Sequence, residues 1–181
     1  MTHSKEYQDI LKKTHQNKKW WGSAEMKDVQ PKIHELIEEY DVKSILDFGC
    51  GKGQNIKFLQ KKYPDIKVFG YDAAYDYEMP DNVDMVISTD VLEHIEPNEL
   101  KNTLEDLKSR TNILQYHNIA CYKASTKLAD GRNAHLIIEN GEWWKKQFED
   151  TGYNVIDEFS YVKKKDVRTF QYYEVVVKTV H

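Results

Sequence analysis

The sequence predicts an α/β fold built on a mostly parallel sheet. Short apolar strands alternate with helical patterns through most of the chain, and a glycine-rich turn, GCGKG at 49–53, joins the first strand to a helix. Near the end, two β-rich runs flank the charged KKKD, a pattern typical of an antiparallel pair. Ligands of such sheets bind beyond the carboxyl ends of the parallel strands, where Asp47, Asp72 and Asp90 are predicted to lie.

Each element has its own signal, beginning with a helix over 26–40 that places Val29, Ile33, Leu36 and Ile37 on one apolar stripe. The further predicted elements are a strand over 44–48, a helix over 54–63, strands over 67–72 and 84–89, a helix over 98–110, a strand over 113–122, a helix over 141–153, and two β-rich runs over 154–162 and 169–177.

Length and composition predict a single domain. The chain has 181 residues, and its 40% hydrophobic residues are enough for a core. We interpret 1–25 as a polar extension, with Trp20 and Trp21 as its unusual feature, and 26–181 as the domain. A net charge of −4 gives no general attraction to nucleic acid, and no apolar run suits a signal peptide or a membrane span. We therefore expect a cytoplasmic protein, with Cys50 and Cys121 reduced.

The glycine turn follows GxGxG, and two side chains indicate its ligand. A dinucleotide fingerprint needs glycine where Gln54 stands, and Asp47 would repel a pyrophosphate but suit a ligand carrying an ammonium and a sulfonium, such as S-adenosylmethionine. Asp72, ending the next strand, is placed to bind both ribose hydroxyls. The alternative is a turn needed only for tight packing. The residues expected at the cofactor are Asp47, Gly49, Gly51, Asp72, Ser88 and Thr89.

Three segments, ILDFGCGKG, VFGYD and DMVISTDVLEHIEP, resemble the first, second and fourth strand motifs of the class I S-adenosylmethionine-dependent methyltransferases. The resemblance covers about 26–181 and implies a Rossmann-like sheet closed by an antiparallel hairpin. The short form and LADGRNAHLI resemble compact members encoded by phages. Only twelve positions separate Asp72 from Asp84, so the sheet is expected to lack an edge strand found in the family. Adenine recognition is unassigned, although Tyr75 and Tyr77 are placed for stacking.

The stretch TDVLEHIEP puts two acids and a histidine after a strand. Asp90, Glu93 and His94 are spaced so that a helical turn would gather them on one face, where the repulsion between the carboxylates favours a divalent metal. His135 would be a fourth ligand. This pattern is similar to ExxEH with a later histidine in Hen1-type RNA 2′-O-methyltransferases and to the ExxEH of ubiquinone-pathway O-methyltransferases, with Asp90 in place of the first Glu. The resemblance implies a catalytic set that holds a divalent metal, and two carboxylates with two imidazoles suit Mn, Fe, Co or Zn better than Mg.

Two alternatives to the metal site stay open. In the first, the methyltransferase is metal-free, with His94 as the general base; in the second, the chain is a non-catalytic module that binds S-adenosylmethionine. His117, inside an apolar strand, is predicted to be a buried, satisfied side chain. We expect O-methylation of a vicinal diol, catechol or sugar, with a small-molecule or glycan acceptor and an RNA 3′ end as the alternative. The sequence does not predict the oligomeric state.

Overall fold

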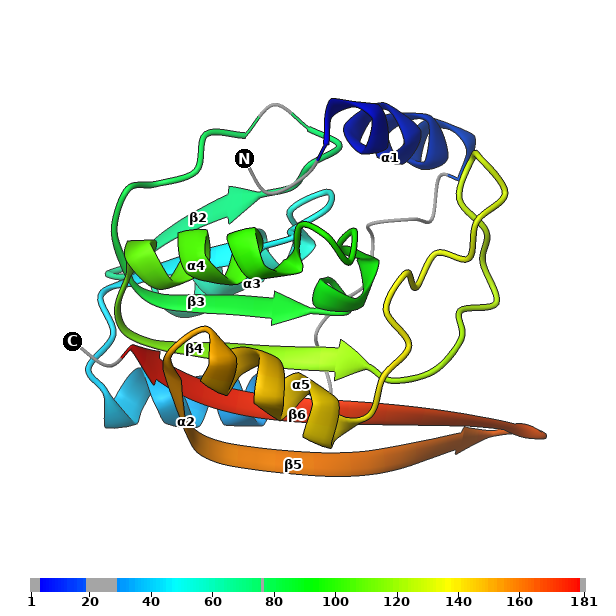
Figure 1. Cartoon of the computed structure of the whole chain (residues 1–181). Coiled ribbons are helices and arrows are strands. Elements are labelled where there is room, and N and C mark those ends of the chain that lie inside the picture. The colour runs from blue at the N-terminus through cyan, green and yellow to red at the C-terminus, as the bar shows by residue number, and fades with distance from the viewer. Residues whose placement is uncertain (1–3, 19–28, 76, 180–181) are drawn as a thin grey trace.

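A computed structural model describes residues 4–18, 29–75 and 77–179 (Figure 1). Trp20, Trp21 and the predicted boundary at 25–26 lie outside the described residues. The elements in chain order are α1 Lys5–Asn17, α2 Gln30–Glu39, β1 Ser44–Phe48, α3 Gln54–Lys62, β2 Lys67–Tyr71, β3 Val83–Thr89, the 3-10 turn η1 Leu92–His94, α4 Leu100–Arg110, β4 Thr111–Ala120, α5 Gly141–Asp150, β5 Tyr153–Lys165 and β6 Arg168–Thr179.

The described strands form a six-stranded sheet in the order β2-β1-β3-β4-β6-β5. The first four are parallel, and β6 and β5 are antiparallel, which confirms the predicted architecture. In this sheet β2 is an edge strand, and neither 73–75 nor 77–82 forms a helix or strand. The chain therefore passes directly from the edge of the sheet to β3, as the short spacing predicts.

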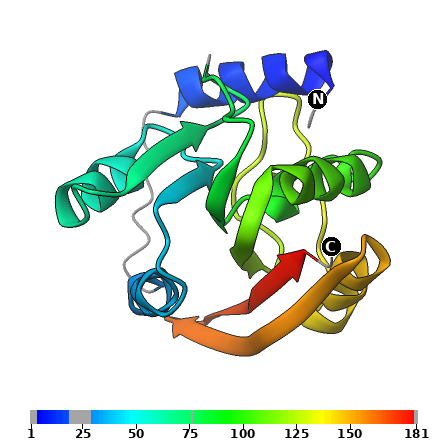
Figure 2. The same ribbon diagram turned by 90° about the vertical axis from the view of Figure 1, so that its left-hand side faces the viewer.

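Helices cover both faces of the sheet, α2 and α3 on one side and α4 and α5 on the other (Figure 2). Alternation along β3 divides the two cores. Met85 and Ile87 pack with α2 and α3, whereas Val86 packs with α4 and α5. Trp144, at the centre of the second layer, is fully buried. The parallel strands all end on one side of the molecule, at the right in Figure 1.

Helix α1 lies across that edge of the sheet, beside the loop that follows β4 (Figure 1). This helix is not predicted from the sequence, which suggests only a polar extension. Ser4 caps it by accepting a hydrogen bond from the Tyr7 amide, and Tyr7, Leu11 and Thr14 are buried. Their spacing at i, i+4 and i+7 is the signal that identifies it. The helix needs only three buried positions to dock on the domain, because it packs on a small separate cluster that contains Leu128 and Ala134.

The β5–β6 hairpin extends past the end of β4. Ala120, the last residue of β4, pairs with Tyr172, so 168–171 continue beyond the sheet toward the side on which the parallel strands end. Cys50 and Cys121 are free thiols, as predicted. Among the described helices, none combines the length and the apolar character needed to cross a membrane.

Candidate functional site

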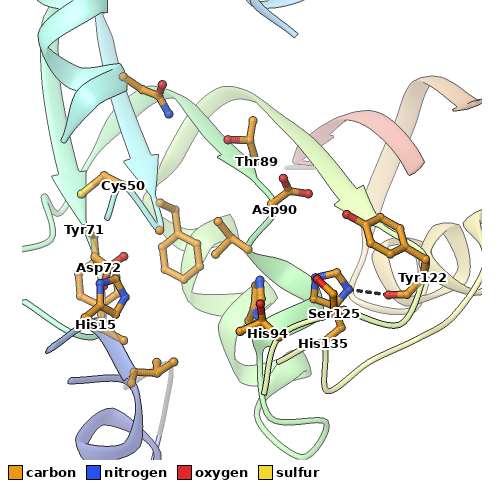
Figure 3. Close-up of a pocket in the computed structure, with 18 of the residues that line it drawn as sticks. His15, Cys50, Tyr71, Asp72, Thr89, Asp90, His94, Tyr122, Ser125 and His135 are labelled. Carbon is orange, nitrogen blue, oxygen red and sulfur yellow. Dashed lines mark hydrogen bonds between the residues drawn. The ribbon is translucent and has the colours of Figure 1, made fainter. Parts of the chain in front are cut away.

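A cavity of about 320 Å³ opens where the parallel strands end. Its wall comes from the turn after β1, the end of β2, the end of β3, the loop after β4, the start of β6 and α1. Figure 3 shows two groups of side chains in it. His15 and Asp72 lie at one end, and His94, His135 and Tyr122 lie at the other, with Asp90 above them. The cavity therefore offers two chemically different ends to one elongated ligand or to two ligands.

The glycine turn is held against the neighbouring strand. The amides of Gly49 and Cys50 both donate to the carbonyl of Tyr71, at 2.7 and 2.9 Å. Gly49 has a φ of 80°, and a Cβ built there would lie 2.3 Å from a methyl group of Val91. Any side chain at this position would both strain the backbone and displace Val91 from the cavity wall. Gly49 is thus required by geometry, and its backbone forms part of the cavity.

Asp72 is fixed by backbone amides, because one carboxylate oxygen accepts from Gly51 at 2.9 Å and the other from Ala74 at 2.8 Å. These two bonds set the plane of the carboxylate at the cavity wall. Each oxygen keeps a further lone pair for a ligand hydroxyl. Gly51 thus reaches the site through its amide, and Asp72 has the arrangement that ribose binding needs.

Asp47 lies behind the wall. It is buried, it accepts a hydrogen bond from the side chain of Asn55, and its Oδ2 has no partner among the described residues. Burial, with the nearby Asp72, raises the pKa of Asp47 to about 7. Asn55 itself lines the cavity. A cationic group arriving there would supply the missing favourable charge, which is what an ammonium-bearing ligand offers.

Ser88 and Thr89, both expected at the cofactor, point to opposite sides of β3. Thr89 lines the cavity. Ser88 is fully buried, and its hydroxyl bonds to Nδ1 of His117 at 2.8 Å, away from the cavity wall. Strand alternation explains the difference, because successive side chains face opposite layers. The buried, satisfied His117 agrees with its prediction.

Glu93, His94 and His135 meet at the other end. Each offers one ligand atom, and the three atoms lie within 4.8 Å of one another. The backbone brings them together, because the carbonyl of Glu93 accepts from the amides of Leu136 at 2.8 Å and Ile137 at 3.0 Å. Those bonds fasten the loop carrying His135 onto the η1 turn. The η1 turn and a loop that follows far along the chain thus form one cluster.

Asp90 does not join this group. A helical turn starting at Asp90 is expected from the sequence, but its φ is 54° and its amide continues the sheet by donating to the carbonyl of Asn118 at 3.0 Å. The 3-10 turn begins only at Leu92, so the helical spacing does not apply to Asp90. Asp90 instead lines the cavity near the cluster. The predicted four-residue set is therefore corrected to three residues plus a neighbouring carboxyl.

The electrostatics of this end favour an ion or a shared proton. Burial, reinforced by Asp90, raises the pKa of Glu93 well above its usual value, and Glu93 Oε2 has no partner among the described residues. Burial also lowers the pKa of His135, so its neutral form is favoured. Burial raises the pKa of Asp90 to about 6, with Lys163 opposing the rise. A cation placed between these groups would reverse the shifts in the two acids.

Three further residues at this end are missed by sequence reasoning. Tyr122, Ser125 and Phe170 line the cavity, and the ring of Tyr122 lies edge-on to His135 with centroids 5.1 Å apart. Phe170 comes from the hairpin and is edge-on to Tyr122 at 5.0 Å. No spacing or motif in the sequence predicts that these residues line the cavity. Phe170, for example, reaches it only through the register of β6 on β4.

A family model described as a methyltransferase domain matches residues 21–158, well over half of the chain. The chain belongs to the methyltransferase domain family. The end of β1, the glycine turn and the β3 edge all fall inside the matched range, so the cavity is the candidate active site of a methyltransferase. No curated protein matches the chain by sequence.

Solved structures agree in fold. A Burkholderia thailandensis 1,6-didemethyltoxoflavin N1-methyltransferase, solved with S-adenosylhomocysteine, superposes with a TM-score of 0.70 at 13% identity, covering 97% of this chain and 90% of that one. An S-adenosylmethionine-dependent methyltransferase from Clostridium acetobutylicum superposes with a TM-score of 0.63 at 14% identity, and the match covers 87% of this chain and 93% of that one. A mitomycin 7-O-methyltransferase superposes with a TM-score of 0.57 at 10% identity, and the match covers 77% of this chain and 50% of that one. The first of these neighbours is named as an N-methyltransferase and the third as an O-methyltransferase, so the shared fold leaves the acceptor of this methyltransferase to be argued from its own side chains.

Proposed function

We propose that this methyltransferase transfers a methyl group from S-adenosylmethionine to a hydroxyl oxygen of a small vicinal diol, catechol or sugar, with a divalent metal held by Glu93, His94 and His135. The nucleoside and amino-acid parts of the cofactor bind along Asp72 and Asp47, and the acceptor binds at the Asp90 end. A structural neighbour with bound S-adenosylhomocysteine supports the cofactor assignment. The observation that carries the metal assignment is the hydrogen bonding of the two histidines.

Nδ1 of His135 lies 2.6 Å from the carbonyl oxygen of Tyr122, and Nδ1 of His94 lies 2.7 Å from that of Ala134. A carbonyl can only accept, so each Nδ1 carries the proton and each Nε2 keeps its lone pair. Nε2 of His135 is 4.0 Å from Glu93 Oε1, too far for a hydrogen bond. Backbone carbonyls fix metal-binding histidines in the same way. The residues therefore fit a divalent ion.

The ligand types indicate which ion. Two imidazoles and one carboxylate suit Zn, Mn, Fe or Co better than Mg, which prefers oxygen ligands. When bound, such an ion lowers the pKa of an acceptor hydroxyl and holds it in place. Oε2 of the buried Glu93 carboxylate, which has no partner within the part of the chain that the structure describes, would gain one. The three-residue set leaves room for oxygens of an acceptor.

The chain's own residues then complete the reaction. Methyl transfer is an in-line displacement, so the protein has to align the acceptor oxygen with the methyl group and exclude water. Tyr122 and Phe170 supply an apolar wall for a ring, and Ser125 supplies a hydroxyl. Asp90, with a pKa of about 6, is ionised at neutral pH and lines the same end. It is placed to accept the proton that the acceptor hydroxyl loses.

Labelled methyl uptake would test the proposal on diols, catechols, sugars and an RNA 3′ end, with purified protein before and after chelation. We expect about one divalent ion per chain, activity lost on chelation and restored by Mn, Zn, Co or Fe, and a loss of both ion and activity in His135→Ala. His34→Ala is the matched control, because that histidine lies on α2 and is absent from the cavity wall. Full activity in a metal-free preparation would reject the metal.

The metal-free alternative rests on the same proton placement, since a neutral His94 with its proton on Nδ1 carries on Nε2 the lone pair that a general base needs. The two versions differ in the response to His135→Ala. A base mechanism leaves substantial activity because His135 does not take the proton, whereas a metal mechanism loses it together with the bound ion. Added Mn shifts the pH profile only in the metal version.

A further inference from the structure

Helix α1 connects the two ends of the cavity. Its first turn contacts the catalytic end, where the Tyr7 hydroxyl donates to the carbonyl of His94 at 2.6 Å and the Ser4 hydroxyl donates to Glu96 at 2.8 Å. Thr14 Oγ1 accepts from the amide of Ala129, on the loop that carries His135, at 3.1 Å. The helix is therefore fastened to both segments that hold the catalytic histidines.

The last turn of the same helix reaches the cofactor end. Leu11 and His15 line the cavity, and Figure 3 shows His15 at the same end of it as Asp72. Nδ1 of His15 lies 3.2 Å from the hydroxyl of Tyr75, and the two rings meet edge-on with centroids 5.2 Å apart. Tyr75 follows Asp72 by three residues, so this contact sets the position of His15 relative to the Asp72 carboxylate.

We propose that His15 is a cofactor-binding residue that hydrogen-bonds a ribose hydroxyl of the bound nucleoside alongside Asp72. The inference rests on the cofactor assignment above and adds a residue from outside the glycine turn and the strand ends. The chemistry of the pair is complementary. Asp72 can only accept when ionised, and its two oxygens already bind Gly51 and Ala74. A neutral imidazole can donate to or accept from the same diol.

The charge state of His15 suits that role. Burial lowers its pKa, an effect that Lys52 reinforces and Asp72 opposes, so the neutral ring is favoured near pH 7. A neutral ring adds no repulsion to the positive sulfonium of the cofactor. His15 belongs to an exposed-looking polar sequence, KEYQDILKKTHQN, and only the docking of α1 brings it to the cavity. We therefore expect its effect on affinity to be specific to the nucleoside half.

Calorimetry with two ligands tests this specificity. S-adenosylhomocysteine carries both the nucleoside and the amino acid, whereas 5′-methylthioadenosine carries the nucleoside and lacks the ammonium. We expect His15→Ala to weaken both by the same factor, about threefold to tenfold, the scale of one lost hydrogen bond. His34→Ala is the control, because its Nδ1 also contacts a tyrosine hydroxyl, Tyr63 at 2.7 Å, but outside the cavity. It should leave both affinities unchanged.

Tyr75→Phe separates binding from packing. If His15 acts only by docking α1 on Tyr75, removing that hydroxyl should reproduce the alanine result; if His15 binds the ribose, Tyr75→Phe should cost much less. Should His15→Ala fail to fold, His15→Phe retains a ring and must show the same equal loss. Unchanged affinities in these His15 variants, or a loss confined to S-adenosylhomocysteine, would overturn the inference. Wild-type protein that binds neither ligand would instead reject the cofactor assignment.

Discussion

His117 in the sheet and His135 at the cavity are both buried, but they differ in what their ring nitrogens bind. His117 is 0% exposed, with Nδ1 2.8 Å from Ser88 Oγ and Nε2 2.9 Å from Gln115 Oε1. His135 is 7% exposed, and its Nε2 faces Glu93 at 4.0 Å without a hydrogen bond between them. The difference teaches that burial does not identify a reactive histidine, whereas an incompletely bonded ring at a cavity does.

The surroundings extend the contrast. Gln115 continues the His117 network to Thr111 at 2.8 Å and to the Tyr153 hydroxyl at 3.1 Å, so the side chains of this network satisfy one another. The network has no access to the cavity and is expected to stabilise the fold. At the other histidine, Nε2 of His135 faces the carboxylate of Glu93, whose Oε2 has no hydrogen-bond partner among the described residues. There, the structure leaves room for a group from outside the chain.

The largest expected effect concerns the unsatisfied cluster. Glu93→Gln keeps the side-chain shape but removes the charge, and we expect it to reduce kcat/KM on the scale of 100-fold or more and to release the metal. At neutral pH the variant should be at least as stable as wild type, because burial disfavours the charged carboxylate that glutamine replaces. Methyl-transfer assays and metal analysis measure the two effects. A variant with normal metal content and activity would show that Glu93 has only a structural role, and the cluster around His135 would then not differ in function from the His117 network.

The next effect concerns the satisfied network. His117→Ala removes the partner of the Ser88 hydroxyl and one of the hydrogen bonds of Gln115, and it opens a cavity beside Phe148, whose ring stacks on His117 at 5.2 Å. We expect a loss of about 2–4 kcal/mol in the free energy of unfolding, with metal content and activity per folded molecule preserved. Denaturant titration measures the loss. A stable variant that had lost its metal would contradict the separation of the two histidines.

The sheet and the glycine turn could be predicted because their signals are local. Alternating apolar strands, the acid at position 47 and the glycines at 49–53 each report on neighbouring residues, and the structure agrees with them. The cluster of Glu93 with His94 and His135 was predicted partly from a resemblance. Asp90 was misplaced because a strand-end φ of 54° cannot be inferred from helical spacing. Helix α1 and Phe170 reach the cavity only through tertiary packing, which leaves no motif.

Acid should distinguish the two kinds of buried group. Burial lowers the pKa of His117 from 6.5 to about 3. Between pH 6.5 and pH 3 the imidazole is therefore protonated in the unfolded chain and neutral in the folded chain. This contribution to stability is complete above pH 6.5 and is lost as the pH falls toward 3. The raised pKa values of Glu93 and Asp90 act in the opposite direction.

We therefore expect the stability difference between wild type and His117→Gln to shrink on acidification, by at most about 1.4 kcal/mol per pH unit. Denaturant unfolding from pH 7 to pH 4 measures it, with Glu93→Gln as the comparison variant. In wild type the raised pKa of Glu93 costs stability at neutral pH, and this cost disappears as the pH falls. The variant has no such cost, so the free energy of unfolding of wild type should rise relative to that of Glu93→Gln on acidification. Parallel wild-type and His117→Gln curves would show that His117 is not held neutral.

The smallest effect concerns Asp47, a buried group whose partner is expected to come from the ligand. Its pKa of about 7 means that roughly half of the free protein carries a proton on Asp47 at pH 7. An ammonium group favours the ionised form, so binding of S-adenosylhomocysteine should release up to about half a proton at that pH. Calorimetry in buffers of different ionisation enthalpy measures the release. Asp47→Asn should abolish it, and 5′-methylthioadenosine, which lacks the ammonium, should not cause it in wild type. Buffer-independent heats for S-adenosylhomocysteine would place Asp47 with His117, as a group that the fold satisfies without help from a ligand.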